Sequence, residues 1–128
     1  MKFTVLQFDL KKYVVDGNFT CDKMQKVHFD ITFHGKVDPI VFIRDYREVC
    51  EIEASDLDEV FKIGNIGPEE KITRLLPMHS ISVGDVIMDE KYRCFVVSGS
   101  GFTRLEKAAT REVIPGTLDA LDKLGIRS

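Results

Sequence analysis

The stretch DVIMDEKYRCFVVSGSGFTRL, residues 85–105, contains short apolar runs separated by turn signals. The runs cover residues 85–88, 92–97 and 102–105, and the turn signals cover residues 89–91 and 98–101. Each run is long enough for one short strand, and tight turns join strands that run in opposite directions. This stretch therefore predicts an antiparallel or mixed β-sheet.

Other segments upstream show the alternation of apolar and polar residues that is typical of half-buried strands. They run from Phe3 to Leu10, from Val27 to Phe33 and from Tyr46 to Ile52. The segment from Val27 to Phe33 alternates most cleanly and predicts a strand with one buried face. The expected buried residues are Phe29, Ile31 and Phe33, and the expected exposed residues are His28, Asp30 and His34.

Helix signals occur between and after these segments. Ser55-Asp56-Leu57-Asp58 is typical of a helix start, and Gly64 is well placed to end that helix. A second short helix is expected from Pro68 to Leu76, and a last one over residues 117–124, which carries Leu118, Leu121 and Leu124. We therefore predict one α+β domain over residues 1–128, with a mainly antiparallel or mixed sheet and two or three short helices.

Composition and charge limit the classes of function. The chain has 128 residues, of which 44% are hydrophobic and 30% charged, as in a globular protein. Its net charge of −3 provides no broad positive field for nucleic acid or anionic lipid. No stretch approaches the ~18 apolar residues of a membrane span, and the N-terminus lacks the apolar segment of a signal peptide. We expect a cytoplasmic protein without a membrane partner.

The three cysteines, Cys21, Cys50 and Cys94, are an odd number with no close pair. This spacing matches neither a disulfide framework nor a zinc knuckle. The expected state is buried or half-buried free thiols in a reducing compartment. His28 and His34 would lie roughly 20 Å apart on a strand, which is too far to share an ion. We predict no metal site and no cofactor.

Two segments carry a resemblance to a known family. They are VCEIEASDLDEVF (49–61) with Asn65 downstream, and SISVGDVI (80–87) followed by KYRC (91–94) and SGSGF (98–102). In their order and spacing these segments resemble the YodL-like type of small uncharacterised phage and mobile-element proteins, over about residues 46–105. The resemblance implies a phage-like origin and a fold, and it implies no established activity. His79 stands where such proteins often have arginine, and residues 20–44 look like an insertion.

The polar residues around this motif are the candidates for a site. Ser80, Ser82 and Asp85 have a structural interpretation, in which they bond nearby backbone N–H groups and fix a turn before a strand. In the functional interpretation they form a polar surface, together with His79, that contacts a ligand or partner. Arg93 and Phe102 complete this set of candidates. Adjacent residues of an extended chain point to opposite sides, so His79 cannot readily serve Ser80, and we assign no catalytic residue.

Three functions compete at this stage. The first is a small, phage-type, non-enzymatic binding protein that engages a host protein in the host cytoplasm. The alternative is an accessory protein that binds nucleic acid through a local basic surface, which the net acidity disfavours without excluding it. The residues of that surface would be Lys91, Tyr92, Arg93, Arg104, Lys107 and Arg111. The third is an enzyme of unidentified activity, because active sites assemble from residues distant in sequence. The oligomeric state stays open.

Overall fold

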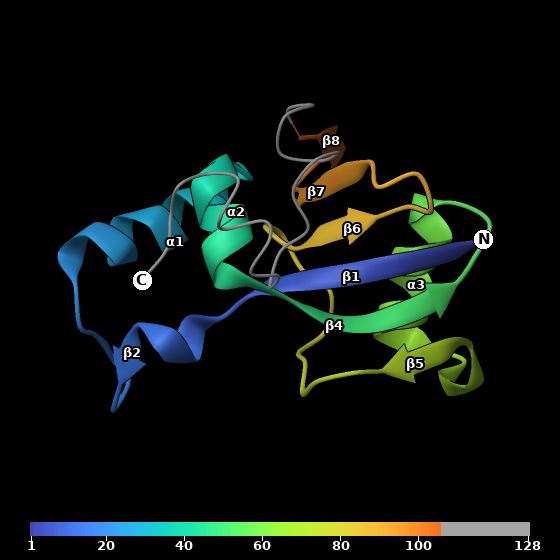
Figure 1. The fold of residues 1–128 in the computed structure, drawn as a ribbon, viewed down its shortest axis with the longest axis horizontal. Helices are drawn as coiled ribbons and strands as arrows, with labels where there is room; N and C mark the ends of the chain where they lie inside the picture. The colour runs from blue at the N-terminus through green and yellow to red at the C-terminus, as the bar shows by residue number, and fades with distance from the viewer. Residues whose placement is uncertain (106–128) are drawn as a thin grey trace.

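The computed structural model describes residues 1–105 (Figure 1). The predicted C-terminal helix, residues 117–124, lies outside these residues, as do Lys107 and Arg111. The strands are β1 (Lys2–Phe8), β2 (Val14–Val15), β3 (Asn18–Phe19), β4 (Tyr46–Glu53), β5 (Ile72–Arg74), β6 (Val86–Met88), β7 (Cys94–Ser98) and β8 (Gly101–Arg104). The helices are α1 (Asp22–His34), α2 (Pro39–Asp45) and α3 (Leu57–Ile66), with short 3-10 helices η1 (Leu10–Lys12) and η2 (Glu69–Lys71).

In residues 1–105 the strands form a six-stranded sheet in the order β5-β4-β1-β6-β7-β8 and a separate β2–β3 hairpin. Every strand pair in both sheets is antiparallel. The predicted α+β class with a mainly antiparallel sheet is confirmed, including the strands and turns of residues 85–105. β1 lies inside the sheet because it pairs with β4 on one side and β6 on the other (Figure 1).

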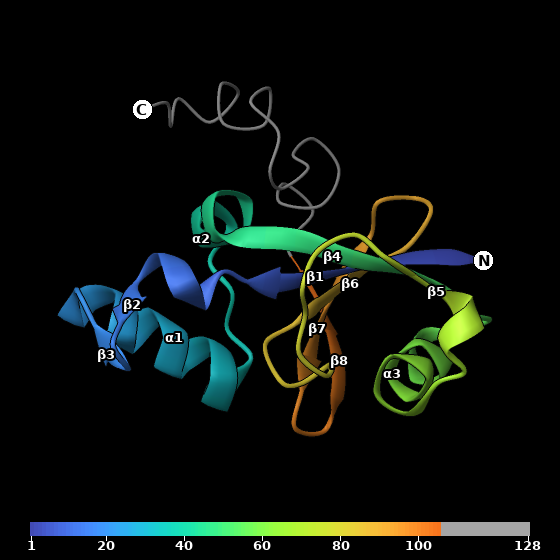
Figure 2. The same cartoon turned by 90° about the horizontal axis from the view of Figure 1, so that it is seen from below.

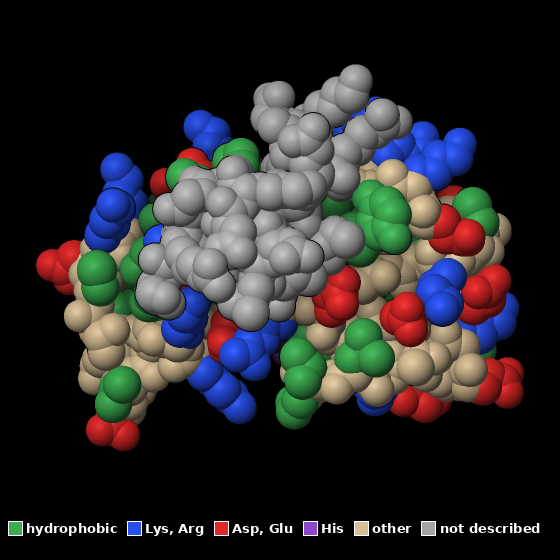
Figure 3. All heavy atoms as spheres, viewed as in Figure 1, with side chains coloured by type: hydrophobic (Ala, Val, Ile, Leu, Met, Phe, Trp, Pro, Cys, Tyr) green, Lys and Arg blue, Asp and Glu red, His purple; other side chains and the backbone are tan. Residues whose placement is uncertain are grey.

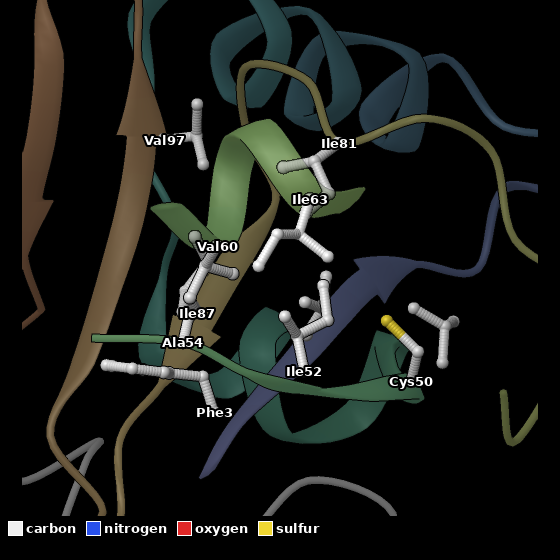
Figure 4. Close-up of a cluster of buried hydrophobic side chains, with 11 residues drawn as sticks. Phe3, Cys50, Ile52, Ala54, Val60, Ile63, Ile81, Ile87 and Val97 are labelled. Atoms are coloured by element: carbon white, nitrogen blue, oxygen red, sulfur yellow. The ribbon is translucent and has the colours of Figure 1, made fainter. Parts of the chain in front are cut away.

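Both faces of the six-stranded sheet are buried. One apolar cluster joins α1 and α2 to one face and includes Leu6, Phe42 and Val86. The other joins α3 to the opposite face and includes Phe3, Val60 and Ile87 (Figure 4). Figure 2 shows α2 and α3 on opposite sides of the sheet. Successive side chains of a strand point to opposite faces, so consecutive residues such as Val86 and Ile87 are both buried, each in a different cluster.

The prediction of a strand at residues 27–33 is wrong, because this segment belongs to helix α1. The helix begins after Cys21 and ends at Gly35, whose φ of 63° is the left-handed conformation typical of a helix C-cap. Met24 and Ile31, seven residues apart, lie on one side of the helix and are buried. The apolar residues of this segment fit both the two-residue repeat of a strand and the repeat of a helix. The helix forms because it packs these apolar residues against the rest of the fold.

The face assignment of this segment changes with its structure. Ile31 is buried as expected, with 2% exposed, but Phe29 and Phe33 are 51% and 70% exposed. On a helix these two rings are one turn apart, and they stack on the surface with centroids 4.5 Å apart. His34 is exposed as expected, whereas Asp30 and His28 are half-buried. Burial lowers the pKa of His28.

Two boundaries around α3 also differ from the prediction. The helix starts as expected, because the Asp56 side chain accepts a hydrogen bond from the backbone N–H of Glu59. It does not end at Gly64 and continues to Ile66. A side chain at Gly64 would collide with Ile81, so this glycine allows Ile81 to lie close to α3 and does not end the helix.

The prediction of a helix over residues 68–76 is also wrong. Only Glu69–Lys71 are helical, as the 3-10 helix η2, and Ile72–Arg74 form β5, which pairs with β4. The apolar residues read as one side of a helix therefore belong to an edge strand and to the chain after it. Local spacing does not distinguish these two structures; the neighbouring strand β4 decides between them.

Candidate binding site

The chain between β5 and β6 carries four of the six ligand or partner candidates, namely His79, Ser80, Ser82 and Asp85. We call residues 77–85 the 77–85 loop. It is held to the body of the protein from β1, α3 and β4, so the geometry of the candidates follows from these anchors.

Gln7 of β1 is the first anchor of the loop. Its side chain is buried, and its Nε2 donates hydrogen bonds to the His79 carbonyl at 2.9 Å and to Asp85 Oδ2 at 3.0 Å. Its Oε1 accepts a hydrogen bond from the backbone N–H of His79 at 3.3 Å. A buried amide is stable only when its donors and acceptor are paired, so this side chain holds both ends of the loop at one point.

Asp85 is the only buried carboxylate of the loop, and it is 4% exposed. Besides the bond from Gln7, its Oδ2 accepts a hydrogen bond from the backbone N–H of Ser82 at 2.9 Å. Burial raises the pKa of Asp85 to about 6, and the Ser82 N–H, His79 and Gln7 oppose that rise. The structural interpretation of this residue, an aspartate that fixes a turn before a strand, agrees with these contacts.

Two further hydrogen bonds anchor the loop through backbone carbonyls between His79 and Asp85. Asn65 of α3 donates through Nδ2 to the Ile81 carbonyl at 3.1 Å, and the buried Tyr46 hydroxyl donates to the Gly84 carbonyl at 2.5 Å. Gly84 has a φ of 94°, and a Cβ there would collide with Ile31 of α1. Helices from both sides of the sheet therefore depend on this one loop for their packing.

His79 lies on the surface of the loop, 4.0 Å from Asp85 through its Nδ1. The same Nδ1 is 2.7 Å from the Ser80 carbonyl oxygen and 3.2 Å from Gln7 Nε2, so the polar contacts of this ring are made through Nδ1. Nε2 is then the ring nitrogen available to a ligand. The contact with Ser80 is made by its carbonyl and not its hydroxyl, so this pair has no nucleophile-base geometry.

A hollow lies on each side of the loop. We call the first the basic pocket; it has a volume of about 480 Å³ and is lined by residues 7–11, Arg47, Val49 and residues 76–79. We call the second the apolar groove; it has a volume of about 470 Å³. Its lining residues are Asp58, Phe61, Ile81, Ser82, Val83, Val97, Ser98, Gly99, Gly101 and Phe102.

The candidate residues do not converge on one hollow. His79 lines the basic pocket, whereas Ser82 and Phe102 line the apolar groove. Asp85 is buried beneath the loop, and Ser80 is exposed. The expected polar surface of His79, Ser80, Ser82 and Asp85 is thus divided by the loop itself.

Of the nucleic-acid candidates within residues 1–105, Lys91, Tyr92 and Arg93 lie between β6 and β7, and Arg104 lies in β8. Arg93 donates through Nε to Asp89 at 2.6 Å, which neutralises its charge locally. Lys91 and Tyr92 are exposed in the turn before β7, and the β7–β8 register places Arg104 opposite Phe95. On the face in Figure 3, acidic and basic side chains are interspersed, so this view shows no field of one sign.

Sequence reasoning missed Gln7, Asn65 and Tyr46, the side chains that hold the loop. Gln7 did carry a signal, because it is a polar residue between apolar neighbours in a strand with both faces buried. Its hydrogen-bond partners, His79 and Asp85, could not be predicted from the sequence because they are 72 and 78 positions away in the chain.

Residues 1–105 contain no group of three metal-ligating side chains and no helix long and apolar enough to cross a membrane. Cys50 and Cys94 are buried free thiols as expected, and burial raises their pKa values to about 11 and about 12, whereas Cys21 is exposed. Comparison of the chain with protein-family models, curated proteins and solved structures finds no match in any of the three.

Proposed function

We propose that this protein is a non-enzymatic binding module that holds an extended apolar segment of another protein in the apolar groove. The observation that carries the proposal is the position of the groove beside β8, which is the edge of the six-stranded sheet within residues 1–105. An exposed edge strand next to an apolar groove can pair with a peptide backbone and hold alternate side chains.

The groove provides apolar contacts from both of its walls. Phe61 of α3 is partly exposed on one wall, and Phe102 of β8 is half-buried on the other. Ile81 and Val97 are buried between them. Aromatic side chains that are partly exposed beside a buried apolar floor are typical of protein-binding surfaces.

The backbone of β8 supplies the second part of the surface. The N–H of Leu105 donates to the Cys94 carbonyl at 2.9 Å, so this residue bonds toward β7. Along an antiparallel strand the bonding direction alternates, so the N–H and C=O groups of Phe102 and Arg104 point away from β7. Those groups can form a ladder with an added strand.

The partner class follows from the groove and from the family resemblance. The groove takes an extended segment with apolar side chains at alternate positions, and Asp58 at its wall favours a basic residue in that segment. A protein of the phage-like origin that the resemblance implies would meet such a segment on a host protein.

The experiment is affinity capture from host lysate with matched substitutions at Arg104. Arg104→Pro removes the outward N–H together with the side chain, whereas Arg104→Ala removes the side chain alone. We expect the partner recovered by the original protein to be retained by Arg104→Ala and lost by Arg104→Pro. Equal recovery by both variants would exclude strand pairing with β8.

A second pair of variants tests the apolar wall. Phe61→Glu introduces a charge in the groove, and Phe33→Glu introduces the same charge at an exposed aromatic position on α1. We expect Phe61→Glu to weaken partner binding by about tenfold or more, as at other interface hot spots, and Phe33→Glu to leave it unchanged. The proposal is rejected if no protein binds in a stoichiometric amount, or if only Phe33→Glu abolishes binding.

A further inference from the structure

We propose that the basic pocket is a binding site for a small organic anion, a carboxylate or sulfonate carried on an apolar body. This inference is independent of the proposed partner in the apolar groove. It rests on the size of the pocket, on its apolar wall and on the charged groups at its edge.

The pocket is formed where three separate segments of the chain meet. The end of β1 and η1 provide residues 7–11, the start of β4 provides Arg47 and Val49, and the chain before and within the 77–85 loop provides residues 76–79. Its volume of about 480 Å³ lies within the range of small-molecule sites, about 300–1,000 Å³. The apolar lining residues are Phe8, Leu10, Val49, Leu76, Pro77 and Met78.

The polar lining is biased toward positive charge. Lys11 and Arg47 are its cations and Asp9 is its single carboxylate. Arg47 contacts Asp9 through Nε at 3.1 Å and is 62% exposed, so its two terminal nitrogens stay available for a carboxylate or sulfonate. The Asp9 contact also orients the guanidinium, which lowers the entropy lost when a ligand binds.

Lys11 and its neighbour Lys12 direct their positive charges to different places. Lys12, next to Lys11, forms an ion pair with the buried Asp45 at 3.0 Å on another side of the chain. Within residues 1–105, Lys11 has no carboxylate partner in ion-pair range, and it lines the pocket instead. His79 adds a third polar group, with Nδ1 engaged by the Ser80 carbonyl and Nε2 available to a ligand.

The lining therefore matches a ligand with one anionic group and a rigid or branched hydrocarbon body. A neutral apolar molecule would offer no anionic group to Lys11 and Arg47. A polyanion such as a nucleotide triphosphate would meet too few cations and an apolar wall. One charge on an apolar body is the class that satisfies both parts of the lining.

The test uses two fluorescent probes that share one aromatic body. The first is 8-anilino-1-naphthalenesulfonate, and the second is N-phenyl-1-naphthylamine, which lacks the sulfonate. We expect the full chain to bind the sulfonate at least about fivefold more tightly than the neutral probe, as for a charge-assisted contact that is partly exposed to solvent. Equal affinity for both probes would overturn the proposal.

Substitutions then locate the site. Arg47→Gln and Lys11→Gln are each expected to weaken sulfonate binding by about fivefold and to leave neutral-probe binding unchanged, and Lys62→Gln on α3 is the matched control. Amide NMR signals of Gln7, Val49 and His79 should shift on titration with the sulfonate. Shifts confined to Phe61 and Phe102 would place the probe in the apolar groove and overturn the proposal, as would a Lys62→Gln effect equal to that of Arg47→Gln.

Discussion

Replacing Asp85 by asparagine removes a buried negative charge and leaves a side chain of the same shape that still accepts the Ser82 and Gln7 hydrogen bonds. The folded protein holds the pKa of Asp85 at about 6, above the ordinary value of 3.8. Between these two pH values the folded state binds more protons than the unfolded chain. Its free energy of unfolding therefore falls as the pH rises through this window.

The magnitude follows from the size of the shift. A rise of about two pKa units corresponds to about 3 kcal/mol between the two protonation states. The original protein should lose this stability relative to Asp85→Asn between about pH 4 and pH 7. Other carboxyl groups titrate in the same range in both proteins, so the difference between the two isolates Asp85.

The assay is urea unfolding of both proteins at several pH values across this window, with equal slopes against urea as the check that both unfold in the same way. The measurement is repeated in a His79→Gln background, because the His79 charge opposes the rise of the Asp85 pKa. In that background the loss of unfolding free energy relative to Asp85→Asn should be larger. A difference in stability that is constant with pH, or that grows as pH rises, would refute the reasoning, since hydrogen bonds would then outweigh burial.

Three further predictions concern the packing around the 77–85 loop and along α1. Gly64→Ala should destabilise the fold by about 1–3 kcal/mol because its Cβ overlaps Ile81, and an additional Ile81→Val should recover part of this in a double-mutant cycle of thermal unfolding. Tyr46→Phe should cost about 1–3 kcal/mol in urea unfolding, because a buried backbone carbonyl loses its donor. Phe29→Ala should cost less than about 1 kcal/mol whereas Ile31→Ala should cost about 2–5, and a similarly large cost for both would favour the strand assignment.

The sequence pointed to residues of the 77–85 loop, but neither to the side chains that hold this loop nor to its geometry. The sequence identified Ser80, Ser82 and Asp85 as a turn before a strand, and the bond from the Ser82 N–H to the Asp85 carboxylate confirms that interpretation for Asp85. It could not show that His79 and Ser82 line different hollows, because their separation depends on contacts of the loop with Gln7 and Asn65. Those partners lie 72 and 16 positions away in the chain.

By itself the sequence determined the strands and turns of residues 85–105, the strands β1 and β4, and the start of α3. Each of these depends on short-range physics: the two-residue period of a strand, the turn residues and the cap at Asp56. Only the tertiary structure decided that residues 27–33 are helical and that residues 72–74 form a strand. These short apolar segments satisfy both periods, so the free energy of burial against Leu6, Gly84 and β4 selects between them.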